Sequence, residues 1–169
     1  MELEERVAEL ERRMASLEGA DRDGGRTAYP VDADFWALEG LKAKLAETGA
    51  VDGGVLFTGA VRLPTDERYE WQYGLPTDAL LDADWSDAAE SFAALGHSVR
   101  MRLLHEILGG RRTVAELTAL EGLGTTGQIY HHLRQLTSAG WLHTAGRGRY
   151  EVPAARVVPL LVVLAASRP

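Results

Sequence analysis

Hydrogen-bonding and basic side chains gather in two stretches between residues 125 and 149, and their chemistry suits a polyanion. The first stretch mixes small, polar and basic residues: Thr125, Thr126, Gly127, Gln128, Tyr130, His131 and Arg134. The second, residues 145–149, is rich in glycine and carries Arg147 and Arg149 with no acid between them. Residues of the first kind can read base edges in a DNA major groove, whereas such arginines can contact phosphate or enter a minor groove. These residues are the candidate DNA-binding set; solubilising turn charges are the alternative for the two arginines.

The residues around this set predict the elements that hold it. Thr125 and Gln128 fit a capping box at the start of a helix, whose inward residues are Ile129, Leu133 and Leu136. Residues 141–144 and 150–152 predict short strands on either side of the two arginines. Three further helices are predicted upstream, with caps at Asp84, Ser98 and Thr113. The first of these is expected to turn Ala88, Phe92, Ala93 and Leu95 inward.

The segment from about residue 91 to residue 152 resembles the ArsR-type (arsenic-repressor-like) winged helix-turn-helix family. The resemblance rests on ALGHSVRMRLL ending at Leu104, TVAELTAL at 113–120, and GQIYHHLRQLTSAG followed by WLHTAGRGRYEV at 127–152. It covers a little over a third of the chain. The family implies a homodimeric DNA-binding regulator, often a repressor released by a ligand. Carried over by position, the recognition helix runs from Thr125 to about Thr137, and the wing holds Arg147 and Arg149.

Two departures from the family pattern concern metals. Many members sense metals through cysteines, and this chain has no cysteine. Others use carboxylate and histidine ligands in the last helix, but residues 157–167 contain no His, Asp or Glu. We therefore expect a regulator that is not a metal sensor of either usual kind, with no metal site and no cofactor.

Charge is divided unevenly along the chain. Residues 1–96 have 9 Lys and Arg against 21 Asp and Glu, whereas residues 97–169 have 9 against 4, so the balances are −12 and +5 within a net charge of −7. A basic half can meet DNA although the whole chain is acidic. The N-terminus is unlike a signal peptide, and the longest apolar run is about half the ~20 residues of a membrane span, so we expect a cytoplasmic protein without membrane contact.

Residues 1–18 predict a coiled coil. Apolar residues follow the alternating spacing of a heptad seam: Leu3, Val7, Leu10, Met14 and Leu17. A parallel dimer would pair Arg6 with Glu11 and Arg13 with Glu18, whereas an antiparallel pair would oppose like charges. A lone amphipathic helix packed on its own chain is the alternative. Residues 19–33 read as a linker.

Residues 34–83 predict a small α-β extension. A short amphipathic helix ending at Gly49 is followed by a β-hairpin over residues 53–74, whose turn spans residues 64–67. One hairpin face is aromatic, and its residues are candidates for a small-molecule pocket: Phe57, Tyr69, Trp71 and Tyr73. The competing interpretation is that these rings cover a core or a dimer contact.

Two other patterns are set aside. Residues 122–127 match the dinucleotide pattern G-x-G-x-x-G, but a helix is predicted before them and no acid follows until Glu151. His131 and His132 are adjacent and would point about 100° apart on a helix, so they do not form a chelate as a pair. His131 is expected to face DNA and His132 to pack. We find no catalytic constellation.

The sequence thus predicts a mainly α fold with β-hairpins: a coiled coil at 1–18, a linker at 19–33, an α-β extension at 34–83, and a winged helix-turn-helix at 84–169 closed by a C-terminal helix. That last helix is expected to pack near residues 85–95, within or between chains. The predicted function is that of a dimeric, sequence-specific regulator of transcription: a repressor that binds double-stranded DNA. A small-molecule effector is a candidate second partner. The alternative is a winged helix used as a protein-interaction module without direct DNA binding.

Overall fold

The computed structural model describes residues 35–146 and 148–168. The chain divides into two units, residues 1–37 and residues 38–169. The predicted coiled-coil seam of residues 1–18 and the predicted linker lie outside the described residues, as does Arg147. The described helices and strands therefore belong to the second unit, apart from the first residues of the helix that enters it.

The described chain begins with a helix and a long hairpin. Helix α2 (Trp36–Thr48) ends at Gly49, whose φ of +71° lies in the left-handed region that glycine adopts without strain. Strands β1 (Gly54–Arg62) and β2 (Arg68–Pro76) pair antiparallel, with Phe57 opposite Tyr73 and Val61 opposite Tyr69. The predicted helix and hairpin are therefore confirmed.

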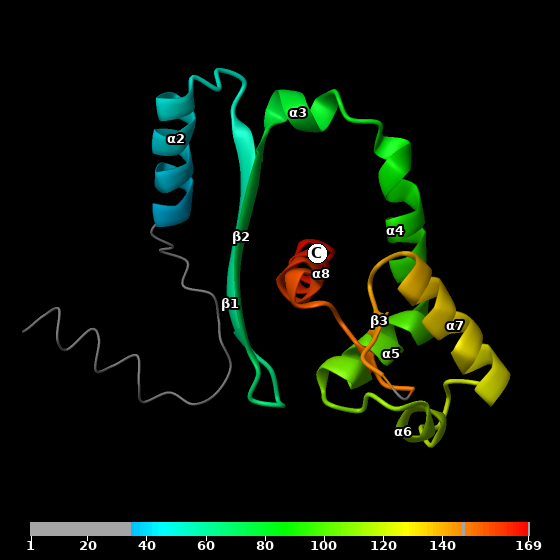
Figure 1. The fold of residues 1–169 in the computed structure, drawn as a ribbon. Coiled ribbons are helices and arrows are strands. Elements are labelled where there is room, and N and C mark those ends of the chain that lie inside the picture. Colours follow the sequence, from blue (N-terminus) through cyan, green and yellow to red (C-terminus); the bar gives the residue numbers. More distant parts are fainter. Residues whose placement is uncertain (1–34, 147, 169) are drawn as a thin grey trace, which may run out of the picture. The chain divides into compact units, whose positions relative to one another are not determined.

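The aromatic face of this hairpin lies against the C-terminal helix α8 (Ala154–Ala166). Figure 1 shows α8, in red, beside β1 and β2. The approach is closest at Gly59, where an added Cβ would lie 2.7 Å from Cγ1 of Val158. The last helix was expected to pack near residues 85–95; it packs mainly on the long hairpin instead. Glycine at position 59 is what allows this approach.

The rest of the chain is a run of short helices followed by a second, much shorter hairpin. Its elements are α3 (Thr77–Leu81), a 3-10 turn η1 (Trp85–Ala88), α4 (Ala89–Leu95), α5 (Ser98–Leu108), α6 (Val114–Thr118), α7 (Thr126–Ser138), β3 (His143–Thr144) and β4 (Tyr150–Glu151). The described residues thus form a mixed fold of helices and two antiparallel hairpins. This agrees with the coarse prediction of helices with β-hairpins.

One apolar core joins these elements. Its fully buried members come from α5, α6, α7, α8 and the segments between them: Leu103, Leu104, Ile107, Leu117, Leu123, Ile129, Leu133, Leu136, Leu142, Val157 and Leu160. Trp141 is also buried; its indole N–H donates to the carbonyl of Ser91 at 3.1 Å, and the Arg156 guanidinium lies 4.9 Å from its ring centroid. Leu63, in the turn of the long hairpin, belongs to the same core.

Two local predictions were wrong. Ser98 was expected to cap α5, but the cap is His97, whose Nδ1 accepts from the amide of Val99 at 3.2 Å. Phe92 and Ala93 were expected to face inward, but Phe92 is 64% exposed and Ala93 is exposed as well, and Ala94 and Leu95 are the buried residues of α4. The helix expected from Asp84 begins as the 3-10 turn η1, capped by Asp84, and only its second part, α4, is an α-helix.

Candidate nucleic-acid interface

Helix α7 places its apolar and its polar side chains on opposite sides. Ile129, Leu133 and Leu136 are buried, and their spacing puts them on one side of a helix. The candidate DNA-binding residues at and after its N-terminus are all exposed: Thr125, Thr126, Gly127, Gln128, Tyr130, His131 and Arg134. Because the three aliphatic side chains fix the rotation of the helix, this polar surface stays turned outward.

The start of α7 is fixed by the predicted capping box. The Thr125 amide donates to Oε1 of Gln128 at 2.8 Å, and the Gln128 amide donates to Oγ1 of Thr125 at 3.4 Å. Each side chain satisfies a backbone donor that the first turn of a helix leaves free. Gln128 was predicted to have both a capping and a DNA-contacting role; with its oxygen used by the cap, its amide NH2 is the group left to face a ligand.

The turn before α7 orients it against α6. Helix α6 has its own capping box between Thr113 and Glu116. Leu123 is buried between Gly122 and Gly124, whose φ values are +80° and +93°. The glycines therefore make the bend between two helices. The pattern G-x-G-x-x-G at this position follows α6 rather than a strand, so its structural context differs from that of a dinucleotide site.

The short hairpin carries Arg149 beside this helix pair. Strand β4 pairs with β3, and Arg149 also forms an isolated bridge with Thr113, the cap of α6. Gly146 and Gly148 have φ of +81° and +71° in the connecting turn. The Arg149 side chain is exposed. Hydrogen bonds from the Thr113 side chain and amide are the main cause that lowers the pKa of Glu116, and the charge of Arg149 adds to this lowering.

Most arginines of the basic half contact groups of their own chain. Five do so: Arg100 with the Ala93 and Ala94 carbonyls and Gln135, Arg102 with the Glu121 carbonyl, Arg111 with Glu106, Arg112 with Glu67 and Glu151, and Arg156 with the Trp141 ring. Among the described residues, no hydrogen bond or ion pair holds the side chains of Arg134 and Arg149. The positive charge that a partner can meet is therefore concentrated at a few side chains, although the balance of the whole half is +5.

A surface hollow of about 380 Å³ lies between α4 and α7 beside the exposed polar surface. His131 and Arg134 line it from α7, together with Gln135 and Ser138, while Arg100 and Glu90 contribute one cation and one acid. Arg100 was not among the predicted site residues. Its guanidinium donates to two α4 carbonyls, six and seven residues earlier, and to the side chain of Gln135. No local sequence pattern predicts these contacts.

The two adjacent histidines of α7, His131 and His132, differ in burial, as predicted. His131 is exposed, whereas His132 is half-buried, with its ring 4.7 Å from that of His97. Burial, and then the neighbouring His97, Arg100 and His131, lower the pKa of His132, so it packs as a neutral ring at neutral pH. Within the described residues, no three His, Asp or Glu side chains come together in a way that could hold a metal ion.

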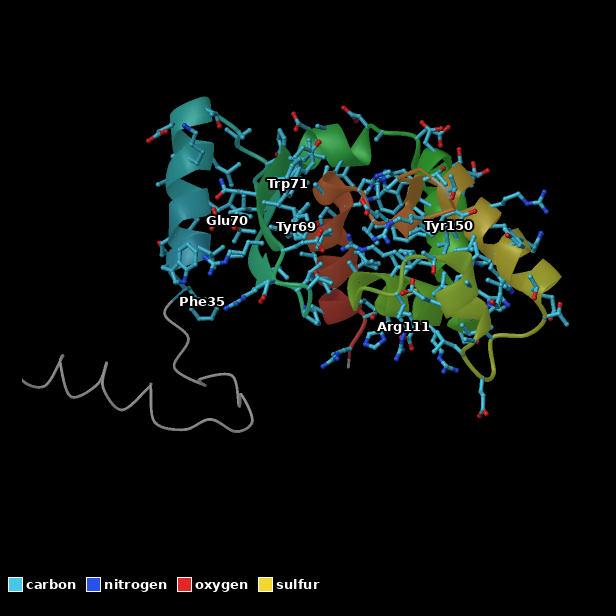
Figure 2. All side chains as sticks on the ribbon, turned by 60° about the horizontal axis from the view of Figure 1, so that its bottom comes forward. Phe35, Tyr69, Glu70, Trp71, Arg111 and Tyr150 are labelled. Carbon is cyan, nitrogen blue, oxygen red and sulfur yellow. The ribbon has the colours of Figure 1, made fainter. Side chains whose placement is uncertain are left out.

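The four aromatic residues proposed as a ligand pocket do not share one environment. The Phe57 and Tyr73 rings lie 5.9 Å apart in a tilted arrangement, and Tyr73 is 48% exposed. Tyr69 packs against the core, and this burial raises its pKa. Figure 2 labels Tyr69 and Trp71 on β2, close to α8. The hollow at Trp71 is lined by Thr58, Gly59, Ala60, Glu70, Trp71 and Gln72, so it does not enclose the other three rings.

Among the described residues, no helix combines the length and apolar character needed to cross a bilayer. No model of a known protein family matches the sequence, and comparison with curated proteins finds no match.

Proposed function

We propose that this chain is a homodimeric, sequence-specific DNA-binding regulator of transcription, acting as a repressor, in which residues 84–169 work as a winged helix-turn-helix. The observation that supports the proposal is the exposed surface of α7 between its cap, Thr125, and Arg134. Small, amide, phenol, imidazole and guanidinium groups lie there together, over a buried stripe that fixes their direction. Such a surface suits the edges of base pairs in a major groove.

In this proposal, α7 enters the major groove, N-terminal end first, and the β3–β4 hairpin follows the backbone beside it. Thr126 and Gly127 allow close approach, while Tyr130, His131 and Arg134 contact bases or phosphates. Arg149, together with the predicted Arg147, contacts phosphate or the minor groove. Two copies would read a palindromic site, and the predicted parallel coiled coil of residues 1–18 would add to the dimer contacts.

A second candidate is a protein-interaction module that does not bind DNA directly. The observation that favours it is the internal use of five arginines, which leaves few cations on the outer surface. Tyr130, 45% exposed near the middle of that surface, is a residue type common in protein interfaces. The salt dependence of binding separates the two candidates, because only contact with DNA releases condensed counterions.

The test is fluorescence anisotropy of the full chain with labelled DNA from its own upstream region, at two salt concentrations, with an unrelated duplex as reference. Sequence-dependent, salt-sensitive binding is expected. The variant Arg134→Ala/Arg149→Ala should bind about 10-fold or more weakly and show a shallower salt dependence, by about two units of slope.

The matched control is Lys42→Ala/Lys44→Ala on α2, which removes the same charge from two exposed side chains. This control should leave affinity and slope close to those of the wild type. Equal affinity of the wild type and the double-arginine variant, or absence of binding to both duplexes at low salt, would reject the regulator and favour the protein-interaction module.

A further inference from the structure

One side chain, that of Arg112, joins the two hairpins of the molecule. Its guanidinium contacts Oε2 of Glu67, in the turn of the β1–β2 hairpin, and Oε1 of Glu151, on β4, the latter at 3.2 Å. The Arg112 side chain is only 14% exposed, against 36% for Glu67 and 30% for Glu151. A charge so far removed from water needs both carboxylates, and both are held at close range.

The turn of the long hairpin is fixed where it meets Arg112. Leu63 is 7% exposed and belongs to the core. The Thr65 hydroxyl donates to Oε2 of Glu67 at 2.6 Å, and an added Cβ on Gly110 would lie 3.0 Å from Cγ2 of Thr65. Packing on both sides thus presents the Glu67 carboxylate to Arg112 in one position.

The backbone of Arg112 continues the connection into the short hairpin. Its carbonyl accepts from the amide of Tyr150 at 2.7 Å, and the next residue, Thr113, bridges to Arg149. The Arg112 amide donates to Oε2 of Glu116 at 3.1 Å, inside the cap of α6. Arg112 is therefore fixed to the long hairpin through its side chain, and to the short hairpin through both its side chain and its backbone.

The short hairpin depends on such outside support. Strands β3 and β4 have two residues each, and a hairpin of that length has little stability of its own. The Nε atom of Arg112 is buried without a hydrogen-bond partner. In the position that brings its guanidinium to both carboxylates, Arg112 leaves the hydrogen bond of this Nε–H unmade.

We propose that Glu67 and Arg112 are positioning residues that hold the β3–β4 hairpin, and with it Arg149, in place for DNA, so that the β1–β2 hairpin controls this contact. The inference rests on the proposed function. It goes beyond that function because it gives the N-terminal extension a role in the grip on DNA, although none of its residues contacts DNA in the proposal.

The test is a double-mutant cycle with Glu67→Gln and Arg149→Ala in the full chain, using the DNA of the anisotropy experiment below the unfolding midpoint of every variant. Glu67→Gln keeps the side-chain shape and removes the charge. We expect it to weaken binding about 5-fold in the wild type and to have no further effect once Arg149 is absent. Additive effects would overturn the proposal, because a merely destabilised protein would lose affinity in both backgrounds.

The matched control is Asp66→Asn, at the neighbouring residue, whose carboxylate pairs with Arg62 at 2.8 Å in an exposed ion pair. This variant should leave DNA affinity unchanged. A loss of affinity equal to that of Glu67→Gln would also overturn the proposal, because it would reflect the lost negative charge rather than the contact with Arg112.

Amide hydrogen exchange without DNA separates this inference from the proposed function. Glu67→Gln should speed exchange at the amides of Tyr150 and Ala145, which donate to the carbonyls of Arg112 and Arg149, while Asp66→Asn should not. If the wild type binds no DNA but exchange responds in this way, the connection between the hairpins stands and the regulator fails. If exchange at these amides does not change, the connection itself is refuted.

Discussion

The two hairpins have opposite structural requirements. The β1–β2 hairpin pairs nine residues on each strand, has its turn packed in the core and lies against α8. The β3–β4 hairpin pairs two residues on each strand and has a turn in which two glycines take positive φ. The long hairpin is held by its own strand pairing and by packing on the core. The short hairpin is held by backbone contacts of Tyr150 with Arg112 and of Arg149 with Thr113.

This difference indicates a division of roles. The long, packed hairpin provides a rigid support, and the short hairpin, held at its base by Arg112 and Thr113, can adjust only at its glycine turn. Adjustment of this kind suits a contact with DNA, whose groove width varies with sequence. Substitutions in either hairpin can test this division.

The largest expected effect concerns the packing of the long hairpin on α8. Gly59→Ala places a methyl group where Cγ1 of Val158 lies 2.7 Å away, so we expect a loss of about 1–3 kcal/mol in the free energy of unfolding, measured with urea. Gly127→Ala is the control, because no atom lies within 4 Å of its added Cβ. Adding Val158→Ala should recover part of the loss. A fully additive double variant would show that the two residues do not meet.

An intermediate effect concerns pH and the Glu67 carboxylate. The hydrogen bond and charge of Arg112, with help from the Thr65 hydroxyl, lower the pKa of Glu67 from 4.5. Because the folded-state pKa is the lower one, the stabilisation is present above pH 4.5 and is lost as the pH falls through the folded-state value. Since 36% of the side chain is exposed, the effect is discounted to about 1 kcal/mol or less.

The measurement for this prediction is the free energy of unfolding of the wild type and Glu67→Gln from pH 7 to pH 3. The gap between the two should be constant near neutrality and close in the acid range. A gap that stays constant throughout would show that Glu67 is not stabilised by Arg112 in solution.

The smallest expected effect concerns the turn of the short hairpin. Gly148 has φ of +71°, and an added Cβ would meet no atom within 4 Å. Gly148→Ala brings backbone strain of at most about 1 kcal/mol, and a turn with open space around it can relax, so the loss in Tm should be smaller than for Glu67→Gln or Gly59→Ala. Gly148→Asn, which tolerates positive φ, should match the wild type. A loss as large as that of Gly59→Ala would contradict the comparison.

The parts of the fold that short-range chemistry determines could be predicted from sequence. The capping box of Thr125 and Gln128 involves partners three residues apart, and the alternation of Phe57, Tyr69 and Tyr73 follows from strand geometry. The buried stripe of α7 likewise follows from helical spacing. In each case the energy that selects the structure lies within one element and its neighbours.

The contacts that were missed depend on tertiary structure. Arg112 and Glu67 lie 45 residues apart, and Arg100 meets Gln135 across 35 residues, so no local pattern marks either pair. His97 replaced the expected Ser98 as a cap because an imidazole nitrogen can accept a hydrogen bond as a hydroxyl does. The basic charge of the C-terminal half was visible in the sequence, but its internal use was not.

The docked turn of the long hairpin also bears on how the chain can change in length over evolution. Hairpin tips usually accept insertions, since they project into water. Here Leu63 is buried and Thr65 lies against Gly110, so added residues would disturb the core and the position of Glu67 together. Length variation is better accommodated at the opposite end of the hairpin, in the turn before β1, where Val51 is 94% exposed. A lineage that varies this protein would therefore lengthen it there and keep residues 63–67 at constant length.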